Sequence, residues 1–205
     1  MRLSRKKQKQ ETRKKLMEAA AAELMSGRSF DTLSLREVAK AAGIAPTSFY
    51  RHFHDMESMG LALIEEHGEA LLELMHRVRN QASEGHSLIR TSVETLFEYF
   101  FSNQGTSRMI LQESMSLHSA FREAAESLFT TMSYDLSEFL VWDAKKRGVP
   151  LAHPRLAANS IVAILFTTGI ALLNTPAKDR DKHIEAAITQ LRMIMRGAEA
   201  MGQGA

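Results

Sequence analysis

Side chains that donate hydrogen bonds are concentrated in one short segment, which follows Gly43 and Pro46. Hydroxyl, imidazole and guanidinium groups bind phosphate oxygens and base edges, and one arginine can make two parallel bonds to a guanine. Phe49 and Phe53 lie four residues apart, so on a helix they share one face and leave the polar groups on the other. This pattern favours contact with a nucleic acid through Thr47, Ser48, Tyr50, Arg51, His52 and His54.

Two short helices must position these groups. Ser34 and Glu37 have the spacing of a capping box, in which each side chain satisfies a backbone amide of the other residue, so a helix is expected to begin there. Gly43 can adopt the positive φ of a tight turn, and Pro46 suits the first turn of the next helix. The segment up to Phe53 is therefore predicted to be a helix-turn-helix, whose second helix enters the major groove of DNA.

Charge is distributed unevenly along the chain, although the net charge is only +2. Residues 1–56 contain twelve Lys and Arg against six Asp and Glu, which gives +6, and the remainder has fourteen against eighteen, which gives −4. Eight of the first fifteen residues are basic. Such an arm could contact phosphates or an anionic membrane surface, or it could be a tail that only increases solubility. Beside a helix-turn-helix, DNA is the expected partner. The expected contact residues are Arg13, Ser34, Arg36, Pro46, Thr47, Ser48, Tyr50, Arg51, His52 and His54.

Composition excludes several other classes of protein. Hydrophobic residues make up 44% of the chain and charged residues 24%, as in a folded globular protein. The absence of cysteine excludes disulfides and thiolate chemistry, and no apolar run of signal-peptide type follows the basic N-terminus, so we expect a cytoplasmic location. The longest apolar run, residues 161–173, is shorter than the roughly 20 residues of a membrane span, so we expect no membrane association.

Motifs of catalysis and metal binding are missing from the sequence. The eight histidines are dispersed without metal-ligand spacing, and there is no nucleophile elbow, glycine-rich phosphate loop or zinc-protease motif. We therefore predict that the chain is not an enzyme and that it holds no metal and no cofactor.

Apolar residues recur at helical spacing in nearly every interval between the four prolines, and no alternating pattern of a strand occurs. We expect an all-α fold of about nine helices. The first domain, residues 1–55, would combine a basic arm with a three-helix helix-turn-helix, and residues 56–205 would form a helical domain for ligand binding and dimerisation. The expected helices cover residues 10–26, 34–42, 46–53, 56–81, 88–101, 106–115, 121–146, 154–173 and 180–199.

The last two expected helices carry a large apolar surface. Helix 154–173 is apolar around most of its circumference, and helix 180–199 has a narrower apolar stripe. They favour a four-helix bundle with the same two helices of a second copy, although they could instead complete the core of a single chain. The predicted dimer interface contains Ile161, Leu165, Leu172, Ile184, Ile188, Leu191 and Met195.

Bulky apolar residues are also concentrated between Phe97 and Phe139. Flexible methionine and aromatic side chains could line a pocket for a hydrophobic ligand, and they could equally form the core of a helical domain. The pocket interpretation names Phe97, Phe100, Phe101, Met109, Met115, Phe129, Met132 and Phe166.

Residues 10–60 resemble the DNA-binding domain of TetR-family transcriptional repressors, because a capped helix is followed by a short recognition helix that ends in Tyr50-Arg-His-Phe53. The resemblance implies a homodimer that binds a palindromic operator in double-stranded DNA, and a helical C-terminal domain that binds a small hydrophobic effector. A closer similarity is to the FabR and DesT type, through Leu33-Ser-Leu-Arg-Glu-Val-Ala39 and Ala42-Gly-Ile-Ala-Pro-Thr-Ser48. That similarity implies a repressor of unsaturated fatty-acid biosynthesis genes.

The same similarity implies that the effector is an acyl-CoA or acyl-carrier-protein thioester, whose head group would need Arg108, Arg122 or the basic run Lys145–Arg147. The chain departs from the broader family at Ala45, where Ser or Thr often caps the recognition helix, and at His54, where Lys is frequent. Two alternatives stay open. One is a TetR-type repressor that senses another hydrophobic molecule, and the other is a protein that uses its basic arm at a membrane surface.

Overall fold

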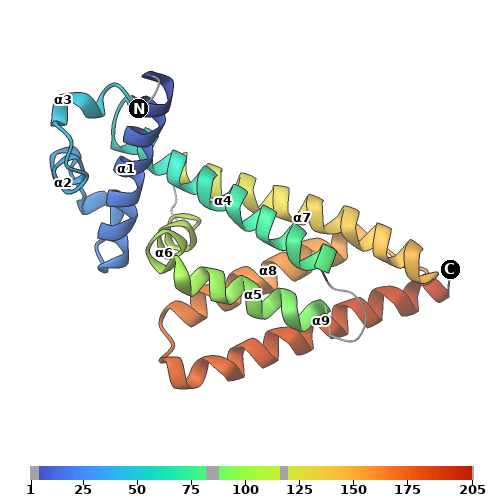
Figure 1. Ribbon diagram of the computed structural model, residues 1–205. Coiled ribbons are helices and arrows are strands. Elements are labelled where there is room, and N and C mark those ends of the chain that lie inside the picture. Colours follow the sequence, from blue (N-terminus) through green and yellow to red (C-terminus); the bar gives the residue numbers. More distant parts are fainter. Residues whose placement is uncertain (1–4, 82–87, 116–119, 205) are drawn as a thin grey trace. The chain divides into compact units, whose positions relative to one another are not determined.

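The computed structural model describes residues 5–81, 88–115 and 120–204, and every regular element in these ranges is helical (Figure 1). The prediction of an all-α fold is confirmed. Nine α-helices and two short 3-10 helices follow one another in the described residues: α1 Arg5–Met25, η1 Phe30–Thr32, α2 Leu35–Ala41, α3 Pro46–Phe49, α4 Met56–Gln81, α5 Leu88–Ser102, α6 Gln104–Glu113, α7 Ala120–Arg147, α8 Pro154–Leu173, η2 Ala177–Asp179 and α9 Arg180–Gln203.

Two helices differ from their predicted bounds in ways that matter for function. Helix α1 begins at Arg5 rather than near Gln10, so the described part of the basic arm is helical. Helix α3 ends at Phe49, earlier than expected. The chain continues from there in tight turns, in which the amide of His52 donates to the carbonyl of Phe49 over 2.8 Å. Helix ends commonly tighten in this way, and a sequence pattern does not separate the tightened turn from the helix.

The fold divides into two compact units. Unit 1 contains the described residues up to Glu69 together with Phe101–Ala125, and unit 2 contains Ala70–Phe100 and Glu126–Ala205. In this division α6 and the first half of α4 are grouped with the N-terminal helices, and the domain boundary after residue 55 stays a prediction. Helices α1 and α6 lie far apart in sequence, so local sequence patterns do not indicate that they belong together.

Contact between α1 and α6 explains why α6 belongs to unit 1. Gly105 in α6 approaches the backbone of α1 so closely that a Cβ atom there would lie 2.5 Å from the carbonyl carbon of Leu24 and from the nitrogen of Met25. The amide of Gly105 donates to the Met25 sulfur over 3.1 Å. A residue with any side chain would therefore push α6 away from α1.

Helices α8 and α9 pack against each other in unit 2 (Figure 1). Ile161 and Leu172 of α8 and Ile188 and Leu191 of α9 are buried. Among the described residues, α8 alone is long and apolar enough to cross a membrane by length and composition, because it extends beyond the apolar run 161–173. Core helices of globular proteins have the same composition, so this feature is weak evidence of a membrane span.

Candidate nucleic-acid interface and ligand cavity

The turn between α2 and α3 has the predicted geometry. Gly43 has a φ of +68°, a region that disfavours side chains, and this conformation lets the chain reverse between the two helices. The amide of Ile44 donates to the carbonyl of Ala39 over 2.8 Å, and Ala39 is fully buried. Pro46 occupies the first turn of α3. Ala45 provides no side-chain cap, as expected of an alanine at this position.

Helix α3 buries one face and exposes the other. Phe49 is fully buried, and its ring lies 5.6 Å from that of Phe53, which is also buried. Tyr50 follows directly but is 65% exposed. The predicted contact residues are therefore accessible to different degrees: Arg36, Pro46, Thr47, Tyr50, Arg51 and His54 are exposed, and Arg13, Ser48 and His52 are half-buried.

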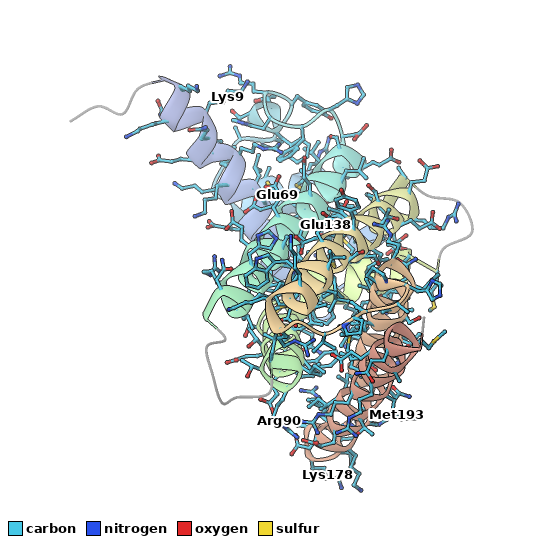
Figure 2. The ribbon with its side chains drawn as sticks, turned by 90° about the vertical axis from the view of Figure 1, so that its right-hand side faces the viewer. Lys9, Glu69, Arg90, Glu138, Lys178 and Met193 are labelled. Atoms are coloured by element: carbon cyan, nitrogen blue, oxygen red, sulfur yellow. The ribbon has the colours of Figure 1, made fainter. Side chains whose placement is uncertain are left out.

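Cations of α1 lie close to the residues that follow α3. The guanidinium of Arg13 lies 4.4 Å above the ring centre of Phe53. Burial lowers the pKa of His52, and the charges of Lys9, Arg13 and Arg51 lower it further. Lys9 is near the N-terminal end of α1 (Figure 2). The basic N-terminal helix and the predicted recognition surface therefore form one electropositive region, as DNA phosphates require.

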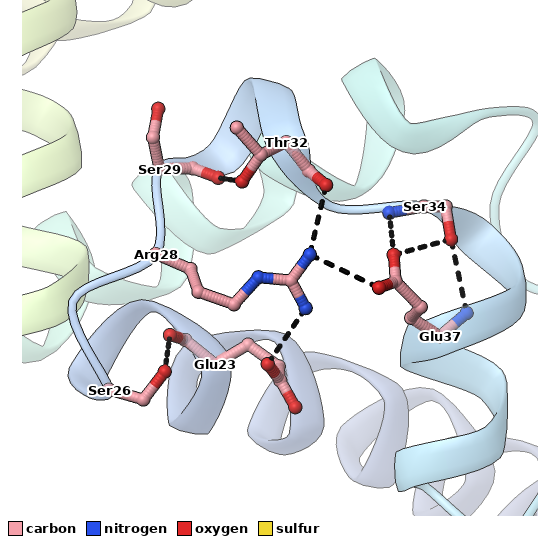
Figure 3. Close-up of polar contacts among 7 residues, drawn as sticks. All are labelled: Glu23, Ser26, Arg28, Ser29, Thr32, Ser34 and Glu37. Carbon is pink, nitrogen blue, oxygen red and sulfur yellow. Dashed lines mark hydrogen bonds and ion pairs between the residues drawn. The ribbon is translucent and has the colours of Figure 1, made fainter.

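The beginning of α2 is fixed by a network of hydrogen bonds (Figure 3). The backbone amide of Ser34 donates to Glu37 Oε2 over 3.0 Å, and the amide of Glu37 donates to Ser34 Oγ over 3.3 Å, which confirms the predicted capping box. The Ser34 hydroxyl donates to the same carboxylate oxygen over 2.6 Å. A phosphate contact from this hydroxyl, as predicted, would have to replace that bond.

Arg28 completes this network, and its contribution was not predicted. Its guanidinium donates to Glu23 Oε2 over 3.1 Å, to the carbonyl of Thr32 over 3.0 Å and to Glu37 Oε1 over 3.2 Å (Figure 3). Hydrogen bonds from Ser34, followed by the charge of Arg28, hold the pKa of Glu37 below its ordinary value. Arg28 thus joins α1, η1 and α2, three elements that no local sequence pattern links.

His54 is engaged with the start of α4. Its Nδ1 lies 2.8 Å from Asp55 Oδ2, and its side chain is 92% exposed. The amide of Ser58 donates to Asp55 Oδ1 over 2.7 Å, and this bond is the main cause of the lowered pKa of Asp55. Asp55 and Ser58 together cap α4, so the predicted contact residue His54 lies at the entry to this helix.

Unit 2 contains a cavity of about 430 Å³, within the size range of ligand sites. Its wall is mainly apolar and comes from α4, α5, α7, α8 and α9. Of the eight predicted pocket residues, Met132 lines it. Phe129 and Phe166 line a separate, smaller groove, with ring centres 4.5 Å apart.

The other five predicted pocket residues line neither hollow. Phe97 and Met109 are buried, Phe100 packs against the apolar core that contains Leu71, and Met115 is 64% exposed. Phe101 is half-buried. Most of these bulky side chains fill space between helices, which was the alternative interpretation. The apolar wall is formed by other residues, four of which, Ile161, Leu165, Leu191 and Met195, were predicted for the dimer interface. The remaining apolar wall residues are Met75, Leu88, Ile89, Val93, Leu96, Leu136, Phe139, Leu140 and Val162.

Charged groups occupy part of the same wall. Arg79 of α4 donates to Asp135 Oδ2 over 2.6 Å, and its side chain is 12% exposed. Arg147 of α7 donates to Asp143 over 2.7 Å and to Glu199 of α9 over 2.8 Å. Arg192 and Arg196 of α9 also line the cavity. Of the cations predicted for a head group, Arg147 is the one that lines this cavity.

Burial of the predicted dimer residues is uneven. Ile161, Leu172, Ile188 and Leu191 are buried within the single chain, whereas Leu165, Ile184 and Met195 are half-buried. The exposed side of α8 and α9 carries small residues and Met193, which is 68% exposed (Figure 2). These outer residues are Ser160, Ala163 and Thr167 of α8 and Ala186, Thr189 and Gly197 of α9.

No group of three or more His, Asp or Glu side chains that could hold a metal ion occurs among residues 5–81, 88–115 and 120–204.

Comparison with known proteins shows a family match in the N-terminal region. Residues 19–63 match the family model described as bacterial regulatory proteins of the tetR family. The match includes the last third of α1, all of α2 and α3, and the start of α4.

Solved structures of transcriptional regulators share the fold. FadR from Bacillus subtilis, determined in complex with stearoyl-CoA, is 15% identical, with a TM-score of 0.72 over 89% of this chain and 97% of that chain. The fatty acid degradation regulator FadR from Bacillus halodurans is 17% identical, with a TM-score of 0.70 over 89% and 96%. The TetR-family regulator PfmR from Thermus thermophilus is 20% identical, with a TM-score of 0.63 over 88% and 97%. At these identities the likeness concerns the fold.

Proposed function

We propose that the chain is a cytoplasmic repressor that binds a palindromic operator as a homodimer. The premise is that residues 19–63 are the DNA-binding domain of a TetR-family transcriptional regulator. We further propose that a long-chain acyl thioester is its effector and that its target genes act in fatty-acid metabolism, with unsaturated fatty-acid biosynthesis as the specific case. The chain itself would carry out no catalysis.

The recognition surface is the observation that carries the proposal. Phe49 and Phe53 hold α3 by its buried face, and Thr47, Tyr50 and Arg51 are presented on the exposed face. Cations of α1 adjoin this surface. In a helix-turn-helix the N-terminal residues of the second helix contact base edges, and surrounding cations bind phosphates. The arrangement supports readout by α3 with α1 on the DNA backbone.

Two copies are needed because each recognition helix reads one half-site. Half-sites that lie one turn of DNA apart need recognition helices separated by about 34–36 Å. We propose that α8 and α9 pair with the same helices of a second copy through their outer residues, including Ala163 and Gly197. Small residues permit close approach of helices, and covering α8 in this way would also account for its apolar composition.

The cavity of unit 2 supports a hydrophobic effector. Its apolar wall suits an acyl chain, and a solved structure with the same fold contains stearoyl-CoA. Helix α4 belongs to unit 1 up to Glu69 and to unit 2 from Ala70, and α5 and α7 also cross from one unit to the other. These three helices are the covalent links through which a ligand could act. A ligand that favours one arrangement of the helices would change the fraction of dimers whose two recognition helices have the separation that DNA requires.

The test measures binding of the full chain to a labelled operator duplex by fluorescence anisotropy. Titrations are repeated with a saturated acyl-CoA, an unsaturated acyl-CoA and free coenzyme A. We expect the apparent affinity for DNA to change with acyl-CoA and to stay constant with free coenzyme A. If neither acyl-CoA changes the affinity, the effector assignment fails while the DNA-binding assignment stands.

A further inference from the structure

We propose that Arg79 binds the polar end of the effector, and that this end is an acyl carbonyl group, in a free carboxylate or in a thioester. The inference rests on the proposed function, because it defines the ligand chemistry of the same cavity. It concerns a residue in the wall of the cavity that lies outside every predicted head-group site.

Arg79 is a cation placed in an apolar wall. It lies near the C-terminal end of α4, its side chain is 12% exposed, and it lines the cavity beside Met75 and Phe139. The guanidinium carbon lies 5.2 Å from the ring centre of Phe139. Removing a charge from water is costly unless it gains partners, so an arginine in this position must be compensated.

The compensation comes from behind the cavity wall. Arg79 Nη1 donates to Asp135 Oδ2, and the other oxygen of Asp135 lies 2.6 Å from His76 Nε2. Asp135 and His76 are not among the residues that line the cavity. A guanidinium has five N–H donors, so a partner at one nitrogen leaves donors for an acceptor inside the cavity.

The other arginines of the wall are balanced differently. Arg147 donates to Asp143 and Glu199, and both of these carboxylates line the cavity themselves. The side chain of Arg147 is also 41% exposed, Arg192 is half-buried and Arg196 is exposed. The Arg79 side chain is only 12% exposed, and its carboxylate partner, Asp135, lies outside the wall.

A ligand for such a site has one apolar body and one oxygen acceptor. A carboxylate forms a charge-assisted bond with a guanidinium, and a thioester carbonyl accepts a hydrogen bond from it. An amine would place a second positive charge next to Arg79. Sites built around a buried polar group reject analogues that lack its complement more strongly than they reject changes in chain length.

The experiment measures direct binding by isothermal titration calorimetry to the full chain without DNA. The probes are a long-chain fatty acid, its coenzyme A thioester and the alkylamine of the same chain length. We expect the wild-type chain to prefer at least one acyl probe over the amine by about 10- to 100-fold. In the variant Arg79→Met/Asp135→Asn, which removes both charges of the pair, this preference should disappear.

Arg79→Lys keeps the charge and should keep part of the preference, and Asp135→Asn alone should keep the preference for acyl probes. The acid and the thioester separate the two sources of the acyl group. An acyl-to-amine ratio that is unchanged in the double variant would overturn the proposal, as would a wild-type chain that binds none of the three probes. Because no DNA is present, these outcomes are independent of operator binding.

Discussion

At the scale of single residues, Arg51 is the strongest candidate for base readout. It is exposed, follows the buried Phe49 by two positions and lies close enough to His52 to lower its pKa. We predict that Arg51→Ala weakens binding to the operator by about 1–3 kcal/mol and relaxes the base preference at one position.

Anisotropy titrations with operator and random duplexes check this prediction. Arg77→Ala is the matched control, because this exposed arginine of unit 2 pairs with Glu73 of its own helix. An equal loss on both duplexes would assign Arg51 to the DNA backbone instead.

Arg28 is predicted to stabilise unit 1 by joining three elements. Its bonds to Glu23, Thr32 and Glu37 are partly exposed, so each contributes little alone. We expect Arg28→Met to lower the free energy of unfolding slightly, measured by chemical denaturation. Glu23→Gln removes the charge of one partner and should cost less. Equal stability of Arg28→Met and the wild-type chain would show that the network has no net effect.

His67 makes stability depend on pH. Burial lowers its pKa from the ordinary 6.5 to about 4, and its Nε2 lies 3.4 Å from Ser107 Oγ within unit 1. In the unfolded chain His67 takes up a proton below its ordinary pKa, whereas the folded chain resists protonation until about pH 4. The contribution of His67 to the free energy of unfolding is therefore complete above pH 6.5. It falls as the pH falls, and about 3 kcal/mol of it is lost at pH 4.

Chemical denaturation of the wild-type chain and of His67→Gln at several pH values checks this sign. The variant should lose less stability on acidification than the wild-type chain, because glutamine takes up no proton. The carboxylates are the same in both proteins and should contribute equally. Parallel curves for the two proteins would contradict the assignment.

At the scale of elements, the contact between α1 and α6 depends on Gly105. Because a Cβ atom would meet the backbone of Leu24 and Met25, we predict that Gly105→Ala destabilises unit 1 despite the better helix propensity of alanine. Thermal unfolding should show a lower midpoint for the variant. Gly204→Ala is a useful comparison, because a Cβ atom there would make only an ordinary contact, 3.9 Å from the carbonyl oxygen of Ala200. A midpoint for Gly105→Ala at or above that of wild type would contradict the close approach.

The basic N-terminal segment belongs to the same scale, because from Arg5 onward it is part of α1. Removal of residues 1–9 should weaken binding to every duplex and flatten the dependence of log affinity on log salt, since fewer counterions would be released. Titrations at several salt concentrations measure this slope. A slope that does not change would assign the segment a role other than phosphate contact.

Local patterns predicted the helices well. The capping box of Ser34 and Glu37, the turn at Gly43 and the full length of α4 and α8 were all found, because each depends on residues close in sequence. The contact of α1 with α6, the bonds of Arg28 and the lining of the cavity depend on residues far apart. Helical periodicity indicates which face is apolar, but it does not indicate which other helix covers that face.

At the scale of the whole molecule, the proposed dimer makes the outer residues of α8 and α9 essential. We predict that Ala163→Glu converts the dimer to a monomer and reduces operator binding with it, because a charge would be buried against the second copy. Sedimentation velocity measures the mass in solution. Ala22→Glu, at an exposed position of α1, is the matched control. An unchanged dimer in Ala163→Glu would place the interface elsewhere.

Selection of random duplex DNA by the purified full chain is the most direct test of sequence-specific recognition, with Arg51→Ala carried through the same rounds. The account predicts enrichment of a palindrome whose half-sites lie about one helical turn apart, and a weaker preference at one position of each half-site for the variant. If no motif is enriched at moderate salt, the chain does not read DNA sequence and the central claim is contradicted.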